Sequence, residues 1–208
     1  MRVKFLSYSV AGLVFLGALL ASAAVTGDDA VDQWAVDGDR SSITFQSNAP
    51  MESFSGTTED ISGSIQWNRS SPQAATGEIS FPVESLRTGN RTRDRHLAGD
   101  DWLNADASPD VRFALQGLED VRVARTESGQ IHYRANAKGT IEVNGVENAT
   151  DASVQVAVLP QDRLARIQFE LEFALADHNV EGVGGDRAIG TAVGEVIQVE
   201  GTVFAAWN

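Results

Sequence analysis

A charged cluster near the middle of the chain holds the residues best suited to acid–base chemistry. Asp94 and His96 stand two positions apart, next to Arg93 and Leu97. A hydrolase would need such a pair within reach of a nucleophile, but the chain has no cysteine and no Gly-x-Ser-x-Gly sequence. We therefore predict a protein that is not an enzyme, and keep catalysis by the Asp94/His96 region as the alternative.

Metal and phosphate sites find little support in the sequence. The histidines, His96, His132 and His178, do not stand at ligand spacing from one another. We predict no metal site. The glycines between Asp177 and Gly194 do not lead from a strand into a helix, so they predict a long flexible loop rather than a phosphate-binding turn.

The N-terminus has the pattern of a secretory signal. Arg2 and Lys4 precede an apolar stretch over residues 10–20, and Ala21-Ser22-Ala23 fits a small-residue cleavage site. We expect residues 1–23 to be a signal peptide cleaved near Ala23, residues 24–32 to be disordered, and the protein to be periplasmic or secreted. The apolar stretch is shorter than the ~20 residues of a membrane span, so we expect no integral span in the mature chain. An uncleaved N-terminal anchor stays open.

Composition restricts the partners of the mature chain. The net charge of the whole chain is −13, and loss of Arg2 and Lys4 makes it more negative. Such a surface repels polyanions, so we expect no nucleic-acid partner. Residues 33–208 fit one domain, given the usual ~100–200 residues per domain. That length can bury a sufficient core without disulfides.

Apolar and polar residues alternate over most of the mature chain. Side chains of a strand point to opposite faces in turn, so this period predicts eight or nine strands with one apolar face. Short turns such as Asn144-Gly145 separate the strands and indicate antiparallel hairpins. A sandwich is possible, but long one-sided strands favour a tall closed barrel, because closure removes exposed edges.

Residues 88–109 interrupt this alternation with a charged, partly helical sequence. Leu97, Trp102 and Leu103 give it apolar anchors, and Pro109 ends it. We predict a short helical insert that covers the mouth of the barrel. Asp94 has a structural interpretation there, in which its carboxylate fixes the insert to the barrel rim by bridging Arg93 and a backbone amide.

The insert carries the residues of a known family signature. The chain resembles the YceI-like polyisoprenoid-binding proteins in Thr88-Gly89-Asn90, Arg93-Asp94, His96-Leu97, Trp102-Leu103-Asn104, Pro109 and Phe113. Weaker likenesses extend this over about residues 33–206. The resemblance implies an all-β fold, an elongated antiparallel lipocalin-like barrel. It also implies an apolar lumen that holds a long isoprenoid or similar lipid, and no established catalysis.

These observations predict a lipid-binding barrel that needs no cofactor other than a bound isoprenoid or quinone lipid. We expect Arg93 and His96 to contact the head group, and Leu97, Trp102 and Leu103 to close the mouth. The apolar face predicts the lining residues Phe45, Ile65, Trp67, Ile79, Phe81, Phe113, Leu115, Tyr133, Ile167, Phe169, Leu171 and Phe173. The alternative is a barrel filled by its own side chains that binds another protein. A homodimer, the lipid's identity and its role in carriage, storage or stress response stay open.

Overall fold

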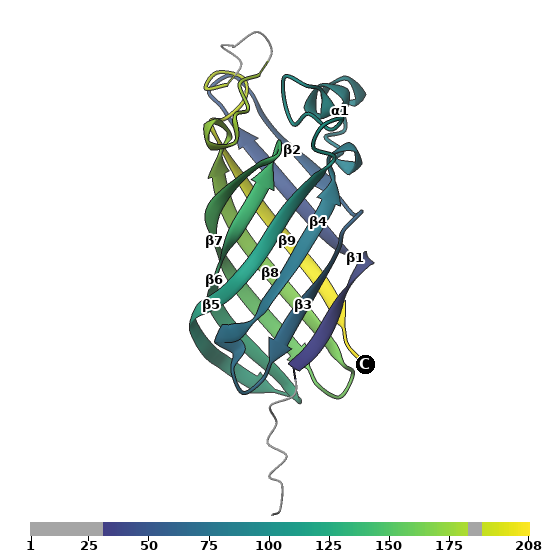
Figure 1. Ribbon diagram of the computed structural model, residues 1–208, viewed down its shortest axis with the longest axis vertical. Coiled ribbons are helices and arrows are strands. Elements are labelled where there is room, and N and C mark those ends of the chain that lie inside the picture. Colours follow the sequence, from purple (N-terminus) through teal and green to yellow (C-terminus); the bar gives the residue numbers. More distant parts are fainter. Residues whose placement is uncertain (1–30, 183–188) are drawn as a thin grey trace, which may run out of the picture.

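The alternating segments form nine strands that curve into a closed barrel in the computed structural model, which describes residues 31–182 and 189–208 (Figure 1). The strands are β1 (Val31–Asn48), β2 (Ser53–Thr58), β3 (Ser62–Asn68), β4 (Thr76–Pro82), β5 (Asp110–Glu127), β6 (Gln130–Val143), β7 (Val146–Leu159), β8 (Leu164–Ala174) and β9 (Val196–Ala206). One α-helix, α1 (Arg91–Ala98), and three 3₁₀ turns, η1 (Pro72–Ala74), η2 (Val83–Ser85) and η3 (Leu175–His178), complete the described elements.

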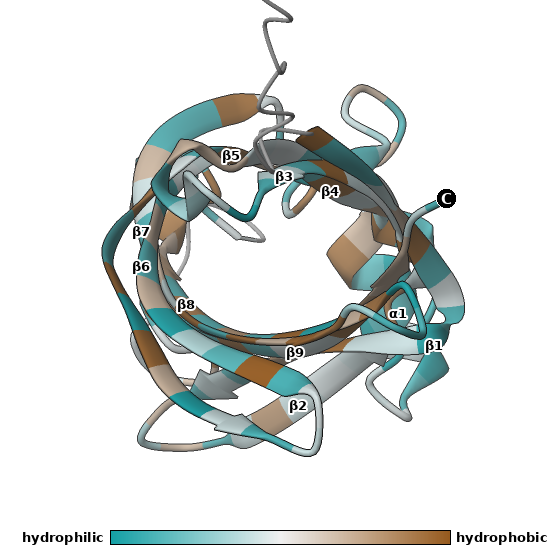
Figure 2. Cartoon of the chain, turned by 90° about the horizontal axis from the view of Figure 1, so that it is seen from below, coloured by the Kyte–Doolittle hydropathy of each residue, from teal (hydrophilic) through white to brown (hydrophobic). Residues whose placement is uncertain are grey.

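The barrel closes where β1 pairs with β9. On its other edge β1 pairs with β3 near its start and with β2 near its end. β2 and β3 therefore share one position in the wall, and the nine strands make an eight-stranded antiparallel barrel. Seen from below, the strands form a closed ring (Figure 2). The predicted all-β, lipocalin-like barrel with one short helical insert is confirmed.

Two tight hairpins match their turn sequences. Asn144 and Gly145 both have positive φ, 51° and 70°, between β6 and β7. Ser128 and Gly129 repeat this geometry, with φ of 51° and 79°, between β5 and β6. Turns with two positive φ angles suit the twist of adjacent antiparallel strands. The first hairpin lies at the end of the barrel that carries α1, which we call the upper end, and the second at the lower end (Figure 1).

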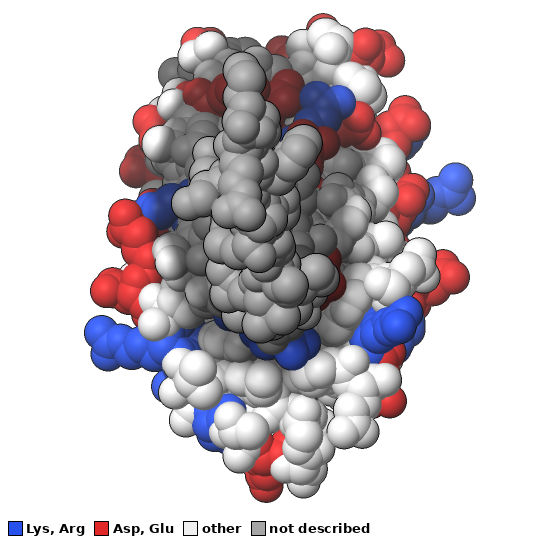
Figure 3. Space-filling view, turned by 60° about the horizontal axis from the view of Figure 1, so that its bottom comes forward, with Lys and Arg blue, Asp and Glu red and all other residues white. Residues whose placement is uncertain are grey.

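The core fills the inside of the barrel in two parts. Around the lower half it includes Trp34, Trp67 and Val203, and around the upper half Val143 and Leu175. Outward-facing residues are mostly polar, as the period of two requires. Acidic and basic side chains mix on the part of the lower face that Figure 3 leaves in view.

Some expectations fall on the ends of the described chain. The predicted signal peptide, residues 1–23, and residues 24–30 lie outside the described residues, as do residues 183–188 of the glycine-rich loop. Val31 and Asp32 were expected to be disordered, and this is wrong. They begin β1 because their backbones pair with Asn68 and Trp67 of β3. Within the described residues, no helix is long and apolar enough to cross a membrane.

Candidate functional site

The inside of the barrel contains two apolar cavities, one above the other. The lower cavity has a volume of about 100 Å³ and the upper one about 90 Å³. They are adjacent at a neck, where five residues line both: Ile43, Phe81, Val111, Ile141 and Val199. The two volumes together are smaller than the roughly 300–1,000 Å³ of usual ligand pockets. A long ligand would therefore have to displace side chains that now fill the lumen.

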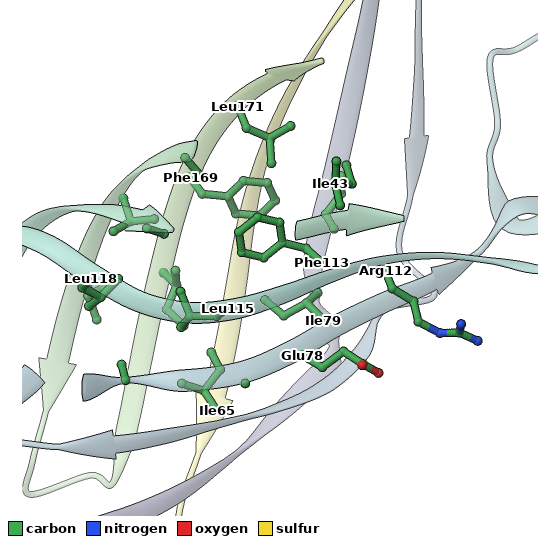
Figure 4. Close-up of a pocket in the computed structure, with 18 of the residues that line it drawn as sticks. Ile43, Ile65, Glu78, Ile79, Arg112, Phe113, Leu115, Leu118, Phe169 and Leu171 are labelled. Carbon is green, nitrogen blue, oxygen red and sulfur yellow. The ribbon is translucent and has the colours of Figure 1, made fainter. Parts of the chain in front are cut away.

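Most of the residues predicted to line the lumen face these cavities. The lower cavity is lined by Ile65, Trp67, Ile79, Phe81, Phe113, Leu115, Ile167, Phe169 and Leu171, and the upper one by Phe45, Phe81, Leu97, Trp102, Leu103 and Phe173. In Figure 4 the labelled apolar side chains point into the lower cavity, whereas Glu78 and Arg112 point away from it. Whether these residues contact a ligand stays a prediction.

Sequence reasoning left out several lining residues. The apolar ones are Trp34, Phe54, the neck residues Ile43, Val111, Ile141 and Val199, and Ala75, Leu86, Leu118, Ala137, Val143, Ala152, Val154, Val156, Leu175, Val180, Val193 and Ile197. Many of them occupy the same alternating face as the predicted residues, so the period of two could have found them. The prediction passed over all the lining alanines and valines, and it also missed large side chains such as Trp34 and Phe54.

Two phenylalanine rings lie against glycines of neighbouring strands, which keeps them close to the wall. A Cβ atom on Gly201 would lie 2.5 Å from Cε1 of Phe169, its direct partner on β8. A Cβ atom on Gly56 would likewise collide with the ring of Phe45, its partner on β1. An alanine at either position would push the ring toward the lumen. Phe169 lines the lower cavity and Phe45 the upper one, so each cavity has one ring that lies against its directly paired glycine.

The lower end of the lumen is closed by stacked aromatic rings. Trp34 stacks on Trp67 with 5.0 Å between ring centroids, and on Trp207 with 5.2 Å. Tyr133 meets Trp67 edge to face at 5.3 Å. Tyr133 is buried in the core but lines neither cavity, so it supports the floor rather than facing the lumen. Burial raises the pKa of its hydroxyl.

The upper end is closed by α1 and the loop that follows it. Asn90 caps α1, and its side-chain oxygen accepts hydrogen bonds from the amides of Thr92 and Arg93. Asp94 accepts hydrogen bonds from the Thr88 hydroxyl, at 2.6 Å, and the Thr88 amide, at 2.8 Å. These bonds, the hydroxyl first, hold the pKa of Asp94 below its usual range. The backbone amide predicted to contact Asp94 is that of Thr88, whereas the ion pair of Arg93 is with Glu52 rather than with Asp94.

The apolar anchors of the insert reach the upper cavity. Leu97, Trp102 and Leu103 all line it, and the last two are each 9% exposed. The start of the glycine-rich loop contacts the insert. Gly182 donates a backbone hydrogen bond to the carbonyl oxygen of Asp101 and lies against the ring of Trp102. The insert and the residues around Gly182 therefore meet at the mouth.

Arg93 and His96 line neither cavity. The Arg93 guanidinium lies over the ring of Phe54, 4.2 Å from its centroid, and its Nη1 is 3.1 Å from Oε1 of Glu52. Phe54 lines the upper cavity, so Arg93 stands just behind the cavity wall. His96 is exposed on α1. Head-group contact by Arg93 and His96 stays a prediction.

The catalytic alternative gains nothing from this geometry. Residues two apart on a helix do not face each other, so Asp94 and His96 do not form a dyad on α1. His178 lies apart from them, fully buried, with Nδ1 2.8 Å from the carbonyl oxygen of Val146. In the described part of the chain, no three His, Cys, Asp or Glu residues come together as a metal-binding group.

Comparison with known proteins gives this barrel a family. The sequence matches the YceI-like domain over residues 34–205, which is nearly the whole described chain. The chain belongs to the YceI-like domain family. It is 31% identical over 121 residues to a UPF0312 protein of Shewanella putrefaciens, covering 58% of this chain and 60% of that protein. It is 26% identical over 142 residues to one from Ectopseudomonas mendocina, covering 68% of each. The chain thus spans less than two thirds of the first of these relatives.

Solved structures of YceI-like proteins share the fold. BcnA of Burkholderia cenocepacia aligns with a TM-score of 0.67 and 17% identity, covering 82% of this chain and 99% of that one. A polyisoprenoid-binding domain from Saccharophagus degradans, implicated in plant cell wall breakdown, aligns with a TM-score of 0.65 and 15% identity, covering 84% and 98%. At these identities the likeness concerns the fold.

Proposed function

We propose that this protein is exported and binds a long-chain isoprenoid or related lipid in its lumen without catalysing a reaction on it. The observation that carries the proposal is the pair of apolar cavities that lie one above the other inside the barrel and share five lining residues at the neck. The description of the Saccharophagus neighbour as polyisoprenoid-binding supports the same class of ligand.

Chain length matters for such a site. Each buried methylene contributes about 0.8 kcal/mol, while association costs roughly 4–15 kcal/mol before loops are ordered. A ten-carbon tail contributes about 8 kcal/mol by the same coefficient and barely offsets that cost. A tail several times longer binds well without strong polar contacts. This fits a lumen whose lining is almost entirely hydrocarbon.

The narrowness of the lumen supports a second candidate function. Cavities of about 100 and 90 Å³ also suit a barrel filled by its own side chains that acts as a protein-interaction module. The two candidates differ in whether the phenylalanine rings move. A lipid binder must let them rotate, because interiors at native packing density have no spare room for a chain.

Native mass spectrometry of protein purified from its own host tests the proposal. We expect a lipid to co-purify with the protein and to be released by organic extraction. The delipidated protein should then bind a polyprenyl or quinone lipid added in detergent. A clean apoprotein that takes up neither lipid would contradict lipid binding and favour the interaction module. The same spectrum tests export, since cleavage after Ala23 predicts a mature mass that lacks residues 1–23.

A further inference from the structure

The floor of the lower cavity contains two buried polar groups without partners. Trp34 and Trp67 are 1% and 2% exposed and both line that cavity. The Nε1 atoms of both indoles are buried and have no hydrogen-bond partner. A buried donor left without an acceptor costs about 1–3 kcal/mol, and native proteins contain few of them. Two such donors on stacked neighbouring rings call for an explanation.

No other side chain of the lower cavity can accept these hydrogen bonds. Its remaining lining residues among those described are apolar, apart from Gly77, Glu78 and Arg112. The side chains of Glu78 and Arg112 point away from the cavity (Figure 4), and Arg112 pairs with Glu142 and Asp110. A ligand that brings an acceptor into the lumen would therefore supply what the lining lacks.

We propose that Trp34 and Trp67 form a recognition site for a neutral carbonyl group at one end of the lipid, such as a ketone, ester or quinone. An indole N–H only donates, so it suits an end group that only accepts. A hydroxyl would bring its own donor and leave that unpaired. A phosphate would bring a charge into a cavity with no cation to pair it, at a cost of several kcal/mol.

This inference rests on the proposed lipid binding and fixes the orientation of the ligand. The carbonyl end enters first and lies on the aromatic floor, and the hydrocarbon tail extends through the neck toward α1. The polar end is then far from Arg93 and His96. Head-group contact at the mouth, which the sequence predicts, becomes the competing arrangement.

The test compares three ligands of similar length: an isoprenoid methyl ketone, the corresponding hydrocarbon and a polyprenyl phosphate. Each is titrated against the wild-type protein, Trp34→Phe, Trp67→Phe and the double variant. Trp207→Phe is the matched control, because Trp207 stacks on Trp34 but does not line the cavity. We expect the double variant to weaken binding of the ketone about tenfold more than binding of the hydrocarbon, and Trp207→Phe to change neither.

Infrared spectroscopy adds a readout that a structural role would not move. In the wild-type complex we expect the ketone C=O stretch at a lower frequency than in a hydrocarbon solvent, and each single variant to reverse part of this shift. The wild-type spectrum keeps the test decisive even if the double variant does not fold.

Four results would overturn the inference. An unshifted C=O stretch, or equal weakening of ketone and hydrocarbon in the variants, would leave lipid binding standing without the carbonyl site. Tightest binding of the phosphate, dependent on Arg93, would place the head group at the mouth. Failure of all three ligands to bind would contradict the proposed function and this inference together.

Discussion

The lower end of the barrel is closed by stacked indole rings, whereas the upper end is closed by a helix and loops held by polar contacts at the rim and by the apolar side chains of Leu97, Trp102 and Leu103. Trp34 and Trp67 lie on the adjacent, hydrogen-bonded strands β1 and β3, so the lower closure is part of the barrel wall itself. The upper closure depends on hydrogen bonds from Thr88 and an ion pair of Arg93. We infer from this difference that the upper end is the entrance, because its polar contacts can break without unfolding the wall.

Blocking the neck between the two halves gives the largest expected effect. Val199→Trp places an indole where both cavities meet, and we expect long-chain binding to weaken at least 100-fold, with overpacking lowering the unfolding free energy by about 1–3 kcal/mol. Gln198→Trp is the matched control, because Gln198 is exposed on the outer face of the same strand. Equilibrium titration with a polyprenyl lipid measures the effect. Unchanged binding in Val199→Trp would mean that the ligand does not pass the neck.

The two glycines that lie against phenylalanine rings allow each half of the lumen to be narrowed separately. Gly201→Ala pushes Phe169 into the lower cavity, and Gly56→Ala pushes Phe45 into the upper one. We expect each to weaken binding of a long chain about tenfold. A chain short enough to occupy one half should respond to only one of the two substitutions. Identical responses to every chain length would contradict a lumen of two separable parts.

Weakening the polar contacts at the upper end should lower the free energy of local opening there and leave the lower half of the barrel unchanged. Asp94→Asn removes the carboxylate that Thr88 contacts, and we expect local opening of α1 to become easier by about 1 kcal/mol. Hydrogen exchange of the Thr88 amide measures this directly. Protection at Trp67 is the internal control. Equal loss of protection at both places would mean that the two ends are not independent.

The same contact predicts a pH dependence. The pKa of Asp94 is lower in the folded protein than in the unfolded chain, where aspartate has a pKa of about 3.9. The stabilisation is therefore fully present above about pH 4 and is lost as pH falls through the lowered folded pKa. We expect protection of the Thr88 amide to decline only in strong acid, and to lose this pH dependence in Asp94→Asn. A decline near neutral pH would contradict the assignment.

The smallest effect is expected at the ion pair. Arg93 and Glu52 are partly exposed, and such pairs contribute about 1 kcal/mol or less. Arg93→Met should leave the unfolding free energy nearly unchanged and accelerate lipid uptake a few-fold in stopped-flow fluorescence. Arg95→Met, on the exposed side of the same helix, should do neither. Slower uptake in Arg93→Met would instead support head-group contact by Arg93.

Local patterns predicted the barrel well because they depend on neighbouring residues. The alternation around Phe169 and the Asn144-Gly145 turn each specify a strand or a hairpin from a few positions. Contacts between distant segments could not be predicted in this way. The contact of the Phe169 ring with Gly201 depends on the register of β8 and β9. The Arg93–Glu52 ion pair joins a helix to a hairpin far away in sequence. The lack of a partner for the indole N–H groups of Trp34 and Trp67 could be recognised only once the packing around them was known.

The central claim is that a long hydrocarbon chain occupies the lumen, and a series of isoprenoid ligands of increasing length tests it most directly. Titration calorimetry of delipidated protein should show binding free energy that grows with length, approaching about 0.8 kcal/mol for each further buried methylene. It should level off once the chain spans both cavities. Affinity that does not depend on length, or no binding at any length, would contradict the claim.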